Sequence, residues 1–267
     1  METHHAGKGS AAEILESHQQ FNAAWSLYAR TSEGGEVAGL DGLSIANARQ
    51  PWYLTNGAIL TKPVTSREDL STRVGAAINY FAAEKCPWFF FGGEQWLGEG
   101  ASETLSALGF AEAFKVVGMV AEQLAPPERP LPEVELRRIA DETGRWALAD
   151  LNADAYHITP DWVRGAVTSE SLWKTPLYGY NAYVDGKPVC TGFGVPLNGV
   201  IYMAYVATAM AHRRKGLAEL LMRRCLEQAS RETGITRTVL HATADGYPVY
   251  LKMGYRPVEQ FTIYVPQ

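Results

Sequence analysis

A short basic turn between a β-prone run and a helix-forming run carries the residues best suited to bind an anion. The turn Arg213-Arg214-Lys215-Gly216 follows the run Val200-Ile-Tyr-Met-Ala-Tyr-Val206. The apolar residues after it recur at the spacing of one helix face: Ala218, Leu221, Met222, Cys225 and Ala229. The first N–H groups of such a helix have no intrahelical partner, and the helix dipole places partial positive charge there. Because Gly216 lets a ligand approach the backbone, the pattern predicts a site for a phosphate ester.

Two stretches in the last quarter or so of the chain resemble the GCN5-related N-acetyltransferases, the GNAT superfamily. The spacing Arg213-x-x-Gly216-x-Ala218 is similar to the pyrophosphate-binding signature of that family: Arg or Gln, two residues, Gly, one residue, then Gly or Ala. Further on, Thr238-Val-Leu-His-Ala-Thr-Ala-Asp-Gly-Tyr-Pro-Val-Tyr-Leu-Lys-Met-Gly-Tyr255 resembles the fifth strand of the family, a short helix with a Tyr, and a closing aromatic residue after Gly. The alternative is a generic strand, turn and helix whose basic turn is merely solvated.

The resemblance implies acetyl-CoA as the cofactor and assigns residues to it. Its diphosphate would lie on the basic turn, and its pantetheine arm would pair with Val206 to Thr208, where the strand splays from its neighbour. Thr243 stands where the family often has Asn or Ser against the pantetheine, although its hydroxyl could equally cap the next helix. The expected cofactor-binding residues are Val206, Ala207, Thr208, Arg213, Arg214, Lys215, Gly216, Leu217, Ala218, Thr243 and Tyr250.

Acetyl transfer to an amine requires a neutral amine, stabilisation of the oxyanion and a proton for the departing thiolate. By resemblance, Tyr250 points at the cofactor sulfur, and a phenol with a pKa of about 10 can donate that proton at neutral pH. The alternative for Tyr250 is a packed aromatic residue. Many family members carry a Glu where this chain has Tyr202, which is a poor proton acceptor. His241 is the nearest titratable alternative, by two-residue alternation along its strand.

We therefore expect a catalytic set of Tyr250, His241 and Tyr202, in which ordered water removes the proton as the amine attacks directly. A covalent acyl-enzyme is not expected, because the sequence has no Gly-x-Ser-x-Gly elbow. A metal is not expected either, because it has no Cys-x-x-Cys and no paired histidines at helical spacing beyond His4-His5.

The proline-rich segment Ala125-Pro-Pro-Glu-Arg-Pro-Leu-Pro132 divides the chain, and similar signals occur in the same order on both sides. The order is a strand, a capped helix, a strand, a short helix and a strand, with matching corners at Leu108-Gly-Phe110 and Met253-Gly-Tyr255. The repeat predicts tandem α/β domains of the GNAT type, each with a mixed, mostly antiparallel sheet flanked by helices. The expected parts are a flexible tail (1–12), a degenerate GNAT-like domain (13–125), a linker (126–132) and an acetyl-CoA-binding domain (133–267).

The helix of the first half opens with Ser66-Arg-Glu-Asp-Leu70, which places two carboxylates where a phosphate needs bare N–H groups. We therefore expect the first half to bind no cofactor. In the second half, the pattern predicts strands over 134–139, 180–184 and 188–195, with an Asp-Gly turn between the last two. It also predicts helices over 144–156 and 161–172.

Composition narrows the choice of partners. The net charge of −5 disfavours a nucleic-acid binder with a broad basic face, and no apolar run approaches the roughly 20 residues that span a bilayer. The three cysteines and the lack of an N-terminal hydrophobic region indicate a cytoplasmic protein. We expect an N-acetyltransferase acting on a small-molecule primary amine. A peptide or protein acceptor, a non-catalytic acyl-CoA sensor and a homodimer remain open.

Overall fold

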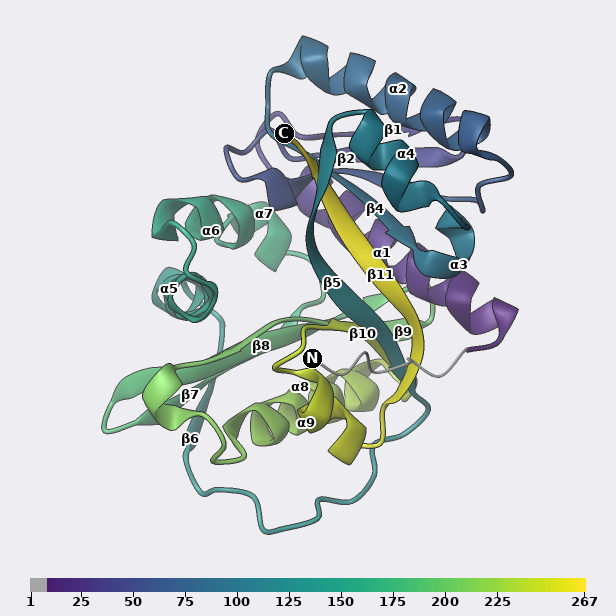
Figure 1. The fold of residues 1–267 in the computed structure, drawn as a ribbon. Helices are drawn as coiled ribbons and strands as arrows, with labels where there is room; N and C mark the ends of the chain where they lie inside the picture. The colour runs from purple at the N-terminus through teal and green to yellow at the C-terminus, as the bar shows by residue number, and fades with distance from the viewer. Residues whose placement is uncertain (1–8) are drawn as a thin grey trace. The chain divides into compact units, whose positions relative to one another are not determined.

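The structure of the protein, a computed structural model, describes residues 9–267 (Figure 1). The chain forms two compact units. Unit 1 consists of the residues through Gly118 together with Pro257–Gln267, and unit 2 consists of Met119–Arg256. The sequence analysis placed all of 133–267 in one domain, whereas the closing segment 257–267 belongs to unit 1. The reason is that this segment forms a strand that pairs with residues 90–93 of unit 1. Of the expected tail, residues 1–8 lie outside the described residues, and residues 11 and 12 are already helical.

The two long helices of unit 1 begin at serine caps. Ser10 and Glu13 form a reciprocal capping box, because each side chain accepts a hydrogen bond from the backbone N–H of the other. Ser66 caps the predicted second helix by accepting from the N–H of Asp69. The elements are α1 (Ala11–Thr31), a 3-10 turn η1 (Tyr53–Thr55), α2 (Arg67–Glu84), α3 (Glu94–Leu97) and α4 (Ala101–Ala107).

The strands of unit 1 form a mixed sheet. Its strand from the C-terminal segment lies between two strands of the first half of the chain. They are β1 (Glu36–Leu40), β2 (Leu43–Asn47), β3 (Asn56–Leu60), β4 (Phe89–Gly93), β5 (Phe110–Ala121, up to Gly118 in this unit) and β11 (Arg256–Pro266). The order is β1-β2-β3-β4-β11-β5. β3 and β4 are parallel, and β1–β2, β2–β3 and β4–β11 are antiparallel. In the last pair, Phe261 lies opposite Gly93, which draws the C-terminal segment into unit 1.

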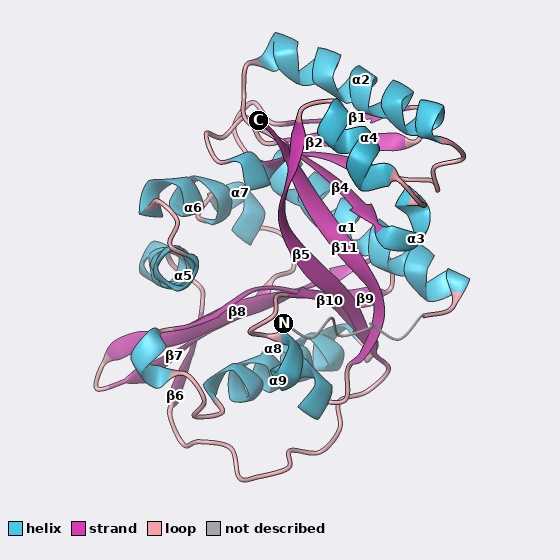
Figure 2. Ribbon diagram, in the orientation of Figure 1, coloured by secondary structure: helices cyan, strands magenta, loops and turns pink. Residues whose placement is uncertain are grey.

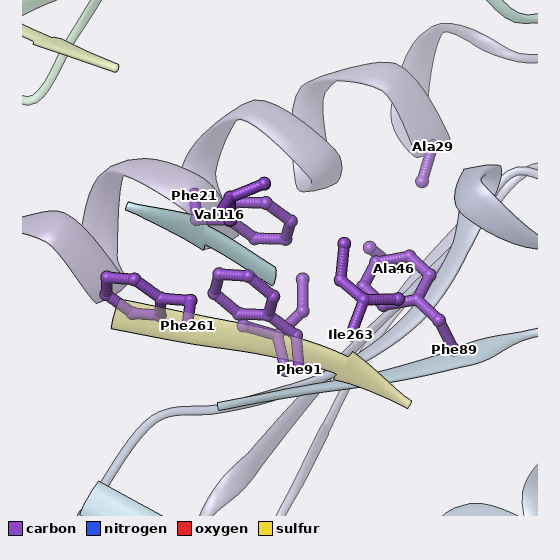
Figure 3. Close-up of a cluster of buried hydrophobic side chains, with 9 residues drawn as sticks. Phe21, Ala29, Ala46, Phe89, Phe91, Val116, Phe261 and Ile263 are labelled. Carbon is purple, nitrogen blue, oxygen red and sulfur yellow. The ribbon is translucent and has the colours of Figure 1, made fainter. Parts of the chain in front are cut away.

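Stacked phenylalanines form the core of unit 1 (Figure 3). The ring of Phe91 stacks on Phe21 of α1 with centroids 3.6 Å apart and on Phe261 of β11 at 5.0 Å. All three side chains are buried. The aromatic run of β4 therefore lies in the core, where Phe91 contacts both the first helix and the last strand.

Unit 2 repeats the mixed pattern with its own strands (Figure 2). They are β6 (Glu135–Arg138), β7 (Tyr178–Val184), β8 (Lys187–Leu197), β9 (Val200–Thr208) and β10 (Thr238–Ala242), in the order β10-β9-β8-β7-β6. β9 and β10 are parallel, and the other neighbours are antiparallel. The predicted α/β class is confirmed, and the strand pairing in each unit is mixed and mostly antiparallel, as expected.

The helices of unit 2 largely follow the sequence pattern. They are α5 (Glu142–Tyr156), α6 (Pro160–Val167), α7 (Glu170–Trp173), a 3-10 turn η2 (Met210–His212), α8 (Leu217–Thr233) and α9 (Tyr247–Lys252). The predicted single helix over 161–172 is wrong, because α6 ends at Val167 and α7 begins at Glu170. The hydroxyl of Thr168, the C-cap of α6, donates to the carbonyl of Arg164, and Ser169 is not helical. Hydroxyl side chains of this kind compete with helical hydrogen bonds. On α8, the predicted residues Leu221, Met222, Cys225 and Ala229 are buried, as expected, whereas Ala218 is half-buried.

Within residues 9–267, none of the helices has the length and apolar character that a membrane crossing requires.

Removing the Phe261 ring should destabilise unit 1, although this residue lies near the end of the sequence. We expect Phe261→Ala to lower the free energy of unfolding by about 3–5 kcal/mol, because the cavity lies in a stacked core. Leu15→Ala on α1, where the side chain is 42% exposed, is the matched control and should change it by less than about 0.5 kcal/mol. Denaturant unfolding checks both. Equal effects of the two variants would contradict the assignment of β11 to this core.

Candidate cofactor and acyl-transfer site

Strands β9 and β10 are paired only where both begin. The parallel register joins Ile201 with Thr238 and Tyr202 with Val239, and within the described part of the chain it goes no further. β9 continues to Thr208 and β10 to Ala242. The strand edge of β9 beyond Tyr202 therefore lacks its neighbour, which is the splayed arrangement expected from the resemblance. Backbone groups left unpaired by a parted strand are available to a ligand.

A β-bulge lies in this parted stretch. The register of β9 with β8 shifts so that Tyr205 and Val206 together face the single residue Gly192. Tyr205 has φ +54°, a left-handed conformation that costs a non-glycine residue about 1–3 kcal/mol. Gly192 allows the close approach, because a Cβ there would lie 3.0 Å from Val206 Cγ2 and 3.2 Å from Leu221 Cδ2.

Helix α5 holds the bulge through two side chains. The buried Asn152 donates from Nδ2 to the carbonyl of Tyr205 at 3.0 Å and to Leu148 O of its own helix at 2.9 Å. The Tyr156 hydroxyl donates to the carbonyl of Val206 at 3.2 Å. Two consecutive carbonyls of the bulge are thus bound from the same helix, one turn apart.

The basic turn leads into α8 as the motif predicts. Gly216 is the N-cap of α8 with φ +80°, where no side chain of the described residues caps the helix, and Arg214 has φ +62°. The first N–H groups of α8 therefore lack a side-chain partner. Arg214 and Lys215 are exposed and form no ion pair with the residues that the structure describes. The turn is positively charged and open.

The proline-rich segment lies over this turn. A Cβ on Gly216 would be 3.2 Å from Pro132 Cδ and 3.8 Å from a guanidinium nitrogen of Arg129. Two hydrogen bonds fix the first residue of the segment. The N–H of Ala125 donates to Met253 O at 2.9 Å, and its carbonyl accepts from Arg223 at 2.7 Å. Arg129 thus adds a further cation beside the start of α8. Sequence reasoning missed it, because the prolines around it indicate only a linker.

The Arg213 side chain links three segments of unit 2 and so acts as a brace. Its guanidinium donates to Thr208 O at 3.2 Å and to Ala155 O at 3.4 Å, and it pairs with Asp245 at 3.1 Å. These contacts tie the end of β9 to the end of α5 and to the loop after β10. The sequence analysis expected Arg213 to contact the cofactor directly; that role stays a prediction, and the structure shows a guanidinium already engaged.

Glu219, in the first turn of α8, is largely buried and paired. Its side chain is 13% exposed and accepts from Arg223 at 2.8 Å. Arg223 also holds Ala125 O, so the pair fastens the proline-rich segment to α8. Pairing with Arg223 balances the one carboxylate in the first turn of α8.

Tyr202 and His241 lie on the two parted strands and meet. The Tyr202 hydroxyl is 3.1 Å from His241 Nδ1, and burial raises the pKa of Tyr202 above its usual range. Tyr250 on α9 is also buried, and burial raises its pKa, so its phenol stays protonated at neutral pH. Thr243 accepts through its backbone carbonyl from Gly246 and Tyr247, and its hydroxyl does not cap α9. The structure thus joins Tyr202 with His241, and their catalytic roles stay predictions.

The corresponding helix of unit 1 is closed at its start. Ser66 accepts from the N–H of Asp69, and the Asp69 carboxylate accepts from both the N–H and the hydroxyl of Thr65. The same carboxylate pairs with Arg73 at 2.7 Å. Those interactions hold the pKa of Asp69 below its usual range. A charged carboxylate at a capped terminus disfavours a second anion.

Comparison with known proteins agrees with this geometry. The sequence model of the acetyltransferase (GNAT) family matches residues 142–255, so this part of the chain is a GNAT domain. The match covers every element from α5 to the end of α9. No curated protein matches the sequence.

Solved structures show the same fold over nearly the whole chain. A GCN5-related N-acetyltransferase from Kribbella flavida is 21% identical with a TM-score of 0.70, covering 97% of this chain and 96% of that one. A functionally unknown conserved protein from Staphylococcus epidermidis is 14% identical with a TM-score of 0.63, covering 87% and 94%. A tandem GNAT protein from the clavulanic acid biosynthesis pathway is 14% identical with a TM-score of 0.57, covering 97% and 96%. The fold is that of a tandem GNAT protein.

The bracing by Arg213 should show in stability. We expect Arg213→Ala to lower the free energy of unfolding by about 1–2 kcal/mol, because it leaves two carbonyls and Asp245 without their donor. Arg214→Ala, in the same turn but exposed and outside any ion pair among residues 9–267, is the matched control and should stay within about 0.5 kcal/mol. Denaturant titrations compare the two, and similar losses in both variants would rule out the brace.

Proposed function

We propose that this protein is an acyl-CoA-dependent N-acetyltransferase that moves an acetyl group from acetyl-CoA to a primary amine of a small molecule. One observation carries the proposal. Inside the domain that matches the GNAT family, the unpaired end of β9 and the uncapped start of α8 are joined by a short basic turn. A strand edge suits an extended amide-containing arm, and a bare helix start suits a diphosphate.

The residues at the turn fit a diphosphate. The N–H groups of Leu217 and Ala218 belong to the first turn of α8, which no side chain of the described residues caps. Arg214, Lys215 and Arg129 supply positive charge around them without a carboxylate partner among the residues described. Val206, Ala207 and Thr208 would hold the arm by backbone hydrogen bonds, and Thr243, directly after the end of β10, would contact it with its hydroxyl. Charge and backbone donors both favour an anionic ligand here.

Acetyl-CoA supplies an acyl group activated as a thioester, and its thiolate leaves as the amine attacks. Tyr250 would donate the proton that the thiolate needs, because burial keeps its phenol protonated. The amine proton would leave through water to His241. If Nδ1–H of His241 donates to the Tyr202 oxygen, Nε2 is the basic nitrogen of the neutral ring and would accept that proton. Tyr202 would then orient the imidazole, because its raised pKa keeps its own hydroxyl protonated and unable to take the amine proton.

Direct attack on the thioester is favoured over an acyl-enzyme. Cys190 lies beside the end of β9, where the Thr208 hydroxyl donates to its sulfur at 3.2 Å. Burial raises the pKa of the Cys190 thiol to about 11. Almost no thiolate therefore exists at neutral pH, and the thiol is a poor nucleophile.

On this proposal, unit 1 binds no cofactor. The capped start of α2, with the Asp69 carboxylate on it, is the feature that supports this role. We further propose a cytosolic enzyme without nucleic-acid partners, which the three free cysteines and the net charge of −5 favour. A homodimer is compatible with this proposal.

A second candidate function is a non-catalytic acyl-CoA sensor, because Tyr202 replaces the carboxylate base. Incubating the protein with acetyl-CoA and a panel of small amines and peptides, while measuring free thiol release, separates the candidates. Amine-dependent release with small amines supports the enzyme, and release only with peptides identifies a peptide acceptor. Binding of acetyl-CoA without release for any amine favours the sensor.

Adding a methyl group to Gly216 should impair coenzyme A binding. Gly216 and Gly234 flank α8 with φ +80° and +75°, so alanine at either position is strained and should cost about 1 kcal/mol of stability. Only at Gly216 does the new methyl group lie at the turn, and we expect about a tenfold or larger loss of affinity there. Calorimetric titration of both variants with coenzyme A measures this. An equal loss at Gly234 would point to general destabilisation instead.

Replacing the Tyr250 hydroxyl should slow turnover. We expect Tyr250→Phe to lower kcat by about 100-fold while the Kd for coenzyme A changes little, because only proton donation is lost. Tyr255→Phe is the matched control: its hydroxyl contacts Thr238 at 2.9 Å and has no proposed part in chemistry.

The pH profile gives an independent check on Tyr250. An acid must keep its proton, so the rate would fall as pH rises through the pKa of Tyr250. Because burial raises that pKa above the usual value of about 10, the wild-type rate should show no alkaline fall below that pH. Unchanged kcat in Tyr250→Phe would remove this residue from the mechanism.

A further inference from the structure

Two side chains of α5 hold the bulge of β9 in a way that bears on the reaction itself. Asn152 and Tyr156 lie four residues apart and therefore on the same face of the helix. Asn152 is 2% exposed, and its amide nitrogen uses both hydrogens, one on Leu148 O and one on Tyr205 O. Tyr156 reaches the next carbonyl, that of Val206.

Holding these carbonyls also aims the amides that follow them. In a planar trans peptide, the C=O of one residue and the N–H of the next point in opposite directions. Because Asn152 binds the oxygen of Tyr205, the N–H of Val206 points away from α5. In the same way, Tyr156 binds Val206 O and so directs the N–H of Ala207.

The bulge needs such support. Tyr205 has a positive φ, and residues in this conformation persist only where the surroundings hold them. Without the Asn152 amide, the peptide between Tyr205 and Val206 could rotate toward ordinary strand geometry. A rotated peptide would present a carbonyl where an N–H stood, and a carbonyl repels a developing oxyanion.

We infer that Asn152 and Tyr156 are positioning residues for acyl transfer: they clamp the bulge of β9 so that the Val206 N–H is held as the donor to the thioester oxygen. The inference rests on the proposed function, because it assigns a part in turnover of acetyl-CoA. It goes further by placing that part on α5 side chains that need not touch the acyl donor.

Kinetics of two variants test the clamp. Asn152→Ala removes both amide hydrogen bonds, and Tyr156→Phe removes one hydroxyl from a half-exposed ring, so the second variant keeps the fold intact. We expect kcat to fall by about 30-fold or more in Asn152→Ala and by about 3- to 10-fold in Tyr156→Phe. The Kd for coenzyme A should stay within about twofold, because the clamp acts on the thioester oxygen and not on the diphosphate. Tyr183→Phe on β7, where the ring stacks under Arg137, is the control and should leave kcat unchanged.

A spectroscopic readout separates positioning from mere stability. In the wild type, the amide proton resonance of Val206 should shift downfield with acetyl-CoA but not with coenzyme A, which lacks the thioester carbonyl. The shift should be lost in Asn152→Ala and reduced in Tyr156→Phe. Unchanged kcat in Tyr156→Phe together with an unaltered Val206 shift would overturn the inference, whether or not Asn152→Ala folds. If the wild type binds acetyl-CoA without transferring it, the proposed function is wrong. The chemical shift of the Val206 amide proton then remains as the test of whether Asn152 and Tyr156 position this N–H.

Discussion

The proposed site depends on the point at which two parallel strands separate. In the described part of the chain, β9 and β10 are not paired beyond Tyr202. Parallel strands normally satisfy each other's backbone groups, and unpaired groups are costly unless something else binds them. Here a bulge turns the backbone of β9 out of register, α5 side chains bind two of its carbonyls, and Arg213 binds the carbonyl of Thr208. Side chains of the protein therefore hold the parted strand, and we propose that its unpaired edge binds the ligand.

The two units show how one architecture can carry different chemistry. Each unit has a mixed sheet with a parallel pair, β3 with β4 and β9 with β10, and a long helix in the connection between those two strands. The difference lies at the start of that helix. In α2, Ser66 and Asp69 satisfy the backbone with the chain's own oxygen atoms, whereas α8 starts at Gly216 without such a cap among the described residues. On the proposed function, this difference at the helix start is what would leave α8, and not α2, able to bind an anion.

Local sequence signals predicted the parts of the site that lie on one stretch of chain. The basic turn, the helix that starts after Gly216 and the apolar face of α8 all follow from spacing, as did the tandem repeat. Local signals could not predict contacts between stretches that are distant in the sequence. Nothing near Asn152 indicates that it binds Tyr205, and nothing in the prolines indicates that Arg129 lies beside Gly216. The closing strand was assigned to the wrong compact unit for the same reason, because strand partners depend on pairing across the chain.

Amide hydrogen exchange with and without coenzyme A tests the central claim most directly, because the account depends on backbone N–H groups. We predict slower exchange on adding coenzyme A in two separate peptides, one covering Val206–Thr208 and one covering Arg214–Ala218. The start of α2, over residues 67–70, should not change. Protection absent from both predicted peptides at saturating coenzyme A, or protection at α2 instead, would contradict the account.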